Sequence, residues 1–281
     1  MSIGKAKICL LIFLLQLVIG LFFFYDKFFY SEEEERELTR RTPNIQIIYP
    51  SPPPLRNVSF DQISQRIIVI TDTRNKDQHQ LERFLARSLD NNISAHQIPQ
   101  VYYNSTTDTE FASSPLLSNK NSINKFLSHV SVWKYAKQQD YNSVIIFEQN
   151  AIFHKNFNDF FKEQWRYLPQ GDISGIQFFH NTNLRTPEDT GLNSRIWFTQ
   201  GFNPGLTAYR ITKSTILFLL NNLNYNRTLD SGTIRTYCST FADHCWIPVT
   251  PLVIPDVSGE DFGTLQDAAY HFNWDLSNYE V

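Results

Sequence analysis

Three polar residues follow an apolar run near the middle of the chain and could bind a cation. Residues 143–147 read as a buried strand, and Glu148, Gln149 and Asn150 come directly after them. Carboxylate and amide oxygens are the ligands that divalent cations such as Ca²⁺ and Mg²⁺ prefer, and a cation held there can neutralise a diphosphate leaving group. Glu148 is the first candidate metal ligand, and the amide oxygens of Gln149 or Asn150 could coordinate weakly; we take Glu148 and Asn150 as the ligand pair. The alternative interpretation is a strand that ends in a polar turn.

A second polar group follows an earlier apolar run. Residues 66–71 form a β-branched run that ends in Thr71, and Asp72 and Arg74 follow closely. In α/β proteins ligands bind at the carboxyl ends of the strands, because loops and helix N-termini converge there. We therefore expect these polar residues to meet Glu148 in one pocket.

The elements that must position these residues are strands that alternate with helices. Short runs typical of buried strands occur at 66–71, 143–147, 175–179 and 206–210. Apolar residues at helical spacing predict helices at 77–89, 122–139, 156–168 and 212–223. This order predicts an α/β fold with a mostly parallel sheet that helices cover on both faces.

Several of these segments carry motifs that recur together in one enzyme family. The motifs are a strand with an Arg-containing turn, a Ser-His pair at a helix start, an acidic motif after a strand, an Ala-Tyr strand before a helix, and a later Asp. In this chain they correspond to 67–74, Ser128 with His129, 147–151, 207–213 and Asp230. In this order they resemble glycosyltransferase family 25, which includes lipopolysaccharide-modifying and collagen-modifying galactosyltransferases. The likeness covers most of residues 66–257.

The resemblance implies a GT-A fold, an α/β sandwich that binds a nucleotide sugar, here of the UDP type, often with Mn²⁺. The donor-binding residues would be Thr71, Asp72, Arg74, Ser128 and His129. The guanidinium of Arg74 would lie near the donor diphosphate, because its geometry suits phosphate oxygens. Asp230 would act as the general base on the acceptor hydroxyl, with Glu148 as the second catalytic residue. The structural alternatives are a Ser-His pair that only supports the helix, and an Asp230 that only forms a turn.

The chain departs from the family at the acidic motif, where Gln149 and Asn150 stand in place of two Asp. The loss of two carboxylates weakens the binding of a divalent cation, because Coulomb attraction makes the largest contribution to its binding free energy. Mn²⁺ dependence is therefore doubtful. Three functions follow: an active hexosyltransferase, with galactose as the family guess; a metal-independent transferase; and a membrane-tethered pseudoenzyme that binds glycans or a partner protein.

The N-terminal segment predicts a membrane anchor. Residues 8–25 are almost entirely apolar, and about 18 to 20 such residues in a helix cross a hydrocarbon core of roughly 30 Å. Lys5 and Lys7 precede this run and the acidic residues 32–35 follow it, which places the C-terminal part in the lumen as a type II protein. The expected organisation is a cytosolic tip and signal-anchor helix at 1–30, an acidic and Pro-rich stem at 31–65, and a lumenal domain at 66–281. The alternative is a cleaved signal peptide.

Sequons and cysteines agree with a lumenal location, in the Golgi or the endoplasmic reticulum. Sequons without a central proline begin at Asn57, Asn92, Asn104 and Asn226. Cys238 and Cys245 are close together and could form one disulfide in an oxidising compartment, with free thiols as the alternative. The net charge of −3 gives no reason to expect a nucleic-acid partner.

Overall fold

The computed structural model describes residues 66–72, 78–167, 175–180, 196–198, 205–241, 244–248, 250–257, 264–272 and 274–281. The expected tip and anchor at 1–30, the stem at 31–65, Asn57 and Arg74 all lie outside these residues. Within the described ranges, no helix is both long enough and apolar enough to cross a membrane.

A seven-stranded sheet forms the centre of the described part, with the strand order β2-β1-β3-β7-β5-β8-β6. Its strands are β1 (Ile67–Thr71), β2 (His96–Pro99), β3 (Ser143–Glu148), β5 (Ile176–Phe178), β6 (Ile196–Phe198), β7 (Ala208–Thr212) and β8 (Cys245–Pro248). β1 pairs in parallel with both β2 and β3, and β5 pairs in parallel with β8. β7 runs antiparallel to β3 and β5, and β6 runs antiparallel to β8. Parallel-pointing strands therefore predominate, and the ends of β1 and β3 lie at the same edge.

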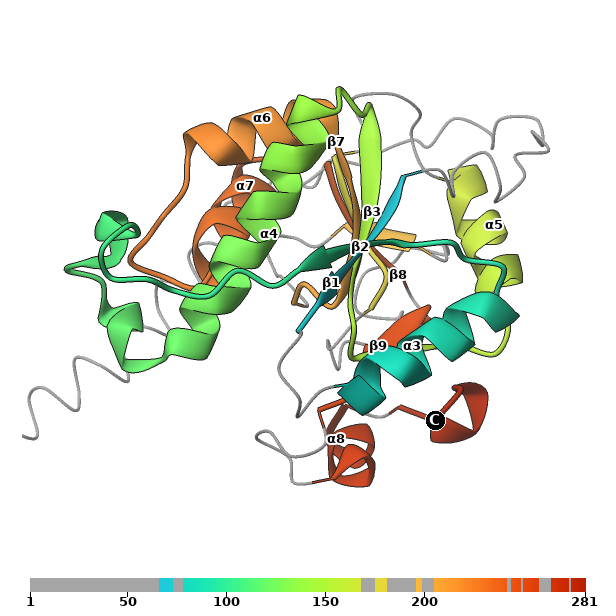
Figure 1. Ribbon diagram of the computed structural model, residues 1–281. Coiled ribbons are helices and arrows are strands. Elements are labelled where there is room, and N and C mark those ends of the chain that lie inside the picture. The colour runs from blue at the N-terminus through green and yellow to red at the C-terminus, as the bar shows by residue number, and fades with distance from the viewer. Residues whose placement is uncertain are drawn as a thin grey trace, which may run out of the picture. The chain divides into compact units, whose positions relative to one another are not determined.

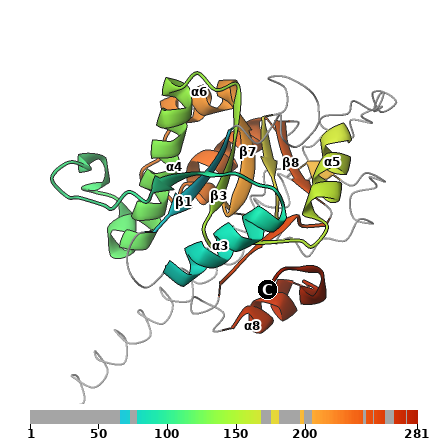
Figure 2. The same ribbon diagram turned by 45° about the vertical axis from the view of Figure 1, so that its right-hand side comes forward.

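Helices cover both faces of this sheet (Figures 1 and 2). They are α3 (Gln78–Asp90), α4 (Lys120–Gln138), α5 (Phe157–Tyr167), α6 (Lys213–Asn221) and α7 (Arg235–Thr240). One buried cluster joins α4, α6 and α7 to one face, and a second joins α3 and α5 to the other. This arrangement explains the composition of β1, whose five residues are all buried, because a strand covered on both sides needs apolar residues at every position.

A small second sheet lies against the C-terminal part. β4 (Ala151–Phe153) pairs antiparallel with β9 (Val253–Pro255), and α8 (Leu265–Phe272) packs beside them around Ile152 and Ile254. Since β4 begins directly after the turn at Gln149 and Asn150, its pairing with β9 brings a segment from the end of the chain next to that turn.

The α/β part of the expected fold is confirmed: the described residues form a mixed α/β fold with mainly parallel strands flanked by helices. The helix expected at 122–139 is observed as α4, Lys120–Gln138, so Ser128 and His129 lie well inside it and not at its start, where the family motif has its Ser-His pair. The side chain of Asn119 accepts the backbone N–H of Ser122 at 3.2 Å, which caps the helix earlier than the motif indicates.

Candidate functional site

A buried series of hydrogen bonds leads from the protein core to Glu148 at the end of β3. The indole Nε1 of Trp133 lies 3.0 Å from the hydroxyl of Tyr209, which lies 2.9 Å from Nδ1 of His129. Nε2 of His129 lies 2.9 Å from Oε1 of Glu148. Trp133 donates to the Tyr209 oxygen, because an indole N–H can only donate. A carboxylate can only accept, so in the neutral imidazole Nδ1 accepts from the Tyr209 hydroxyl. Nε2 then carries the proton that His129 donates to the Glu148 carboxylate.

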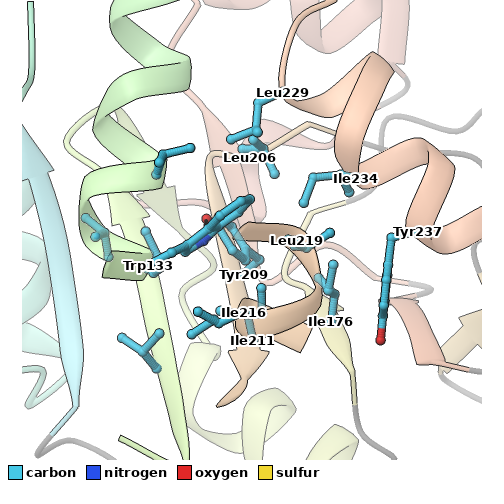
Figure 3. Close-up of a cluster of buried hydrophobic side chains, with 14 of the residues drawn as sticks. Trp133, Ile176, Leu206, Tyr209, Ile211, Ile216, Leu219, Leu229, Ile234 and Tyr237 are labelled. Carbon is cyan, nitrogen blue, oxygen red and sulfur yellow. Dashed lines mark hydrogen bonds between the residues drawn. The ribbon is translucent and has the colours of Figure 1, made fainter. Parts of the chain in front are cut away.

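These side chains meet because α4 crosses the face of β3 and β7. His129 and Trp133 are one helical turn apart on α4, so they lie on the same side of the helix. Tyr209 pairs with Ile146 across β3 and β7, and its side chain lies in the buried cluster with Trp133 (Figure 3). His129 and Tyr209 are both 0% exposed. Burial raises the pKa of Tyr209 well above its usual value and outweighs the hydrogen bond from Trp133, so the phenol keeps its proton.

Lys125 approaches the same carboxylate from the solvent side. Its Nζ lies 3.0 Å from Oε1 of Glu148, and its side chain is 49% exposed while that of Glu148 is 14% exposed. Burial by itself raises the pKa of Glu148, but the Lys125 ammonium and the hydrogen bond from His129 outweigh it and lower the pKa to about 2. Glu148 is therefore ionised at neutral pH, and one of its oxygens receives two donors.

Gln149 joins the ends of β1 and β3. Its side-chain Oε1 accepts the backbone N–H of Asp72 at 2.8 Å, and its own N–H donates to the carbonyl of Ile70 at 3.2 Å. The hydroxyl of Tyr102 donates to the Asp72 carboxylate. The Gln149 amide oxygen is thus used in a hydrogen bond that holds the ends of β1 and β3 together.

The hydroxyls of Thr71 and Ser128 contact β2 and the segment that follows it. Ser128 is 1% exposed; its Oγ accepts the N–H of Val101 at 2.9 Å and donates to the carbonyl of Asn124 at 2.6 Å. Thr71 is 3% exposed, and its hydroxyl lies 3.5 Å from the carbonyl of Ile98. Both residues lie beside the expected donor site, but their hydroxyls are used within the protein.

Asn150 contacts a residue that sequence reasoning missed. Its backbone carbonyl accepts the N–H of Asp256 at 2.7 Å, and its Nδ2 lies 3.5 Å from the Asp256 carbonyl. Its Oδ1 is buried and has no hydrogen-bond partner among the described residues. The Asp256 carboxylate lies 3.4 Å from the guanidinium of Arg83. A cavity of about 230 Å³ opens beside this pair, with Arg87 and Ile152 also in its wall. Asp256 directly follows an apolar strand, the same pattern that drew attention to Glu148, so this pattern could have found it.

The residues at the end of β3 do not fit a divalent cation. Glu148 is the one carboxylate of the motif, and its Oε1 already receives Lys125 and His129. The amide oxygen of Gln149 accepts a backbone N–H, and the Lys125 ammonium beside Glu148 would repel a second positive charge. In the described part of the chain, no three His, Cys, Asp or Glu residues come close enough together to hold a metal ion.

The structure does not bring Asp230 into contact with Glu148. Asp230 begins the π-helical turn η5 (Asp230–Ile234), is partly exposed, and its Oδ1 accepts the N–H of Ser231 at 2.9 Å. The preceding residue, Leu229, lies in the same buried cluster as Leu206 and Tyr209 (Figure 3). The hydrophobic core therefore links the Asp230 turn to β7, but no described hydrogen bond joins Asp230 to the network around Glu148.

Lys125, Trp133 and Tyr209 were also missed by sequence reasoning. Lys125, His129 and Trp133 follow one another at intervals of four residues along α4, which places them on one helix face. That spacing is visible in the sequence, although the partners on β3 and β7 are not.

The remaining predicted sites make no described hydrogen bond to this network. Cys238 in α7 and Cys245 at the start of β8 are joined by a disulfide. Of the four sequon residues, the three that the structure describes are exposed: Asn92, Asn104 and Asn226.

Comparison with known protein families agrees with this picture. The model of glycosyltransferase family 25, described as an LPS biosynthesis protein, matches residues 58–231. This stretch is more than half of the 281 residues and includes β1, α4, β3, β7 and Asp230. No curated protein matches the chain. With the motifs in family order and most of the network within the matched stretch, the chain belongs to glycosyltransferase family 25.

Proposed function

We propose that the protein transfers a hexose, with galactose as the first candidate, from a UDP-type nucleotide sugar to a hydroxyl group of a glycan or protein. Membership of the family implies a glycosyltransferase with a nucleotide-sugar donor and an acceptor. The observation that supports an active enzyme is the network that ends at Glu148. Buried His129 holds the carboxylate from the core side, and the half-exposed Lys125 places a positive charge on its solvent side.

The reaction needs a cation at the leaving group and a base at the acceptor. The acceptor oxygen forms a bond to the anomeric carbon of the sugar as the bond from that carbon to the diphosphate oxygen breaks, and the electron pair stays on the diphosphate. The acceptor proton passes to a general base, for which Asp230 is our candidate. Glu148 acts on the donor side, where it orients the Lys125 ammonium.

We further propose that the enzyme works in the secretory pathway, in the Golgi or the endoplasmic reticulum, anchored by the apolar segment within residues 1–30. The disulfide between Cys238 and Cys245 supports an oxidising compartment. The exposed sequon residues Asn92, Asn104 and Asn226 are compatible with lumenal glycosylation.

A second candidate function is a tethered pseudoenzyme that binds a glycan or a partner protein. It is supported by the turn that follows Glu148, where the side-chain oxygen of Gln149 is bonded to the backbone of Asp72 and Asn150 is bonded to Asp256. These hydrogen bonds stabilise the end of the sheet, so both residues have a structural role that does not require catalysis.

The test uses the full-length chain, purified from eukaryotic microsomes in detergent. The protein is incubated with radiolabelled UDP-galactose, UDP-glucose and UDP-N-acetylglucosamine and with glycan and protein acceptors, and both UDP release and transfer are measured. An active enzyme transfers label from one of these donors, and Glu148→Ala abolishes that transfer while the exposed control Glu110→Ala does not. If no donor is transferred or hydrolysed although the protein is folded and binds UDP, the pseudoenzyme replaces the transferase as the better account.

A further inference from the structure

Lys125 is the outward end of an otherwise buried network. Trp133, Tyr209 and His129 are each at most 1% exposed, and Glu148 is covered except for a small part. Lys125 differs, since about half of its side chain faces solvent. The network therefore ends in an ammonium group that stands at the edge where β1 and β3 finish.

The position of this ammonium is set more firmly than that of an ordinary surface lysine. An exposed ion pair contributes little, because both long side chains lose freedom in forming it. Here the carboxylate partner does not move freely, since Nε2 of His129 lies 2.9 Å from the same oxygen and His129 is itself held by Tyr209. A charge held in place before a ligand arrives needs little reorganisation when the ligand binds.

The two residues that follow Glu148 add no negative charge at the end of β3. Gln149 and Asn150 carry no charge, and the residues here do not fit a divalent cation. With carboxylates at both positions, Lys125 would face a strongly negative site. With amides there, Lys125 pairs with Glu148, and about half of its side chain faces solvent.

We propose that the Lys125 ammonium, held by Glu148, binds the diphosphate of the nucleotide-sugar donor in the position that a divalent cation takes in metal-dependent enzymes. This inference rests on the proposed function and makes donor binding independent of metal. When the bond between the sugar and the diphosphate breaks, the ammonium faces the added negative charge on the leaving oxygen.

The test measures UDP binding by calorimetry with the full-length protein in detergent, once in EDTA and once with Mn²⁺. The wild-type protein binds UDP equally in both conditions. Lys125→Gln binds about ten- to a hundredfold more weakly, because it loses a hydrogen bond between charged groups. Lys125→Arg keeps most of the affinity. Lys134→Gln, which removes an exposed lysine from the same helix, binds as the wild type does.

A second measurement does not depend on any variant. Inorganic pyrophosphate, which carries the same diphosphate group without the nucleoside, competes with UDP for the wild-type protein in EDTA. Circular dichroism and the melting temperature check that the Lys125 variants are folded.

The possible results separate this inference from the proposed function. Three results would each overturn the role of Lys125: UDP binding only with Mn²⁺, unchanged UDP binding by folded Lys125→Gln, and no competition by pyrophosphate. None of the three contradicts the proposed transfer activity. Metal-free UDP binding that depends on Lys125 in a protein without transfer activity supports the inference and contradicts the transferase. No UDP binding in either condition overturns both the inference and the UDP-type donor.

Discussion

Nζ of Lys125 and Oε1 of Glu148 lie 3.0 Å apart, at an oxygen that also receives Nε2 of His129. Both donors come from one face of α4, one turn apart, and the acceptor comes from the end of β3. A carboxylate this well covered depends on its partners, because removing one partner of a buried pair leaves an uncompensated charge.

The first prediction concerns the pH dependence of stability. Burial raises the pKa of Glu148, but the Lys125 ammonium and the hydrogen bond from His129 outweigh it, so the pKa falls from 4.5 to about 2 on folding. Because the folded pKa is depressed, the ionised carboxylate stabilises the fold above pH 4.5, and this contribution is lost as the pH falls toward 2. We expect it to amount to about 3 kcal/mol, since one pKa unit corresponds to about 1.4 kcal/mol. Urea unfolding of the wild type and of Glu148→Gln at pH 7, 5 and 3 measures it.

The difference in unfolding free energy between these two proteins should shrink steadily below pH 5. Glu110→Gln, at an exposed position, serves as the control and should track the wild type. A difference that stays constant down to pH 3 would show that Glu148 is not depressed in the folded state.

The second prediction concerns the hydroxyl of Tyr209. Tyr209→Phe removes the group that accepts from Trp133 and donates to His129, and it leaves both buried nitrogens without their partner. We expect a loss of about 1 to 3 kcal/mol in the free energy of unfolding. Tyr103→Phe is the matched control, because Tyr103 is partly buried and packs edge-on against Phe111. Equal small losses for both variants would argue against the relay.

The third prediction concerns Asp230 as the general base. Asp230→Asn should lower the transfer rate by about a hundred- to ten-thousandfold, the range usual for a general base, while the affinity for UDP stays the same. Rates are measured at saturating donor and acceptor. Asp159→Asn, an exposed acid on α5, should leave the rate unchanged. A fall in UDP affinity without a fall in rate would place Asp230 on the donor side instead.

The fourth prediction concerns metal binding at the altered motif. Adding a carboxylate and removing the opposing ammonium should create an Mn²⁺ site, since charge dominates the affinity for a divalent cation. The double variant Lys125→Gln and Asn150→Asp is therefore expected to bind Mn²⁺ more tightly than the wild type does, as measured by the paramagnetic resonance of free Mn²⁺. The control double variant combines Lys125→Gln with Asn221→Asp, at an exposed position on α6, and should not bind Mn²⁺ more tightly than the wild type does. Tight Mn²⁺ binding by the wild type would contradict the misfit described above.

Much of the fold was accessible from the sequence, because its signals are local. Apolar residues at helical spacing predicted α3, α4, α5 and α6, and β-branched runs predicted β1 and β3, each close to its observed bounds. Short strands without such a signal were missed. β2 reads His-Gln-Ile-Pro and is formed by pairing with β1, and β4 and β9 are formed by pairing with each other.

The sequence by itself determined that an acidic residue ends β3 and that polar residues follow β1, since both follow from the order of residues along the chain. Only the tertiary structure decided what these residues contact. His129 and Tyr209 are 80 positions apart and Asn150 and Asp256 are 106 apart. The contacts of each pair therefore exist only once α4 has packed against β7 and β4 has paired with β9. The physical reason is that a hydrogen bond or an ion pair depends on distances of about 3 Å between side chains, and the chain order does not set those distances.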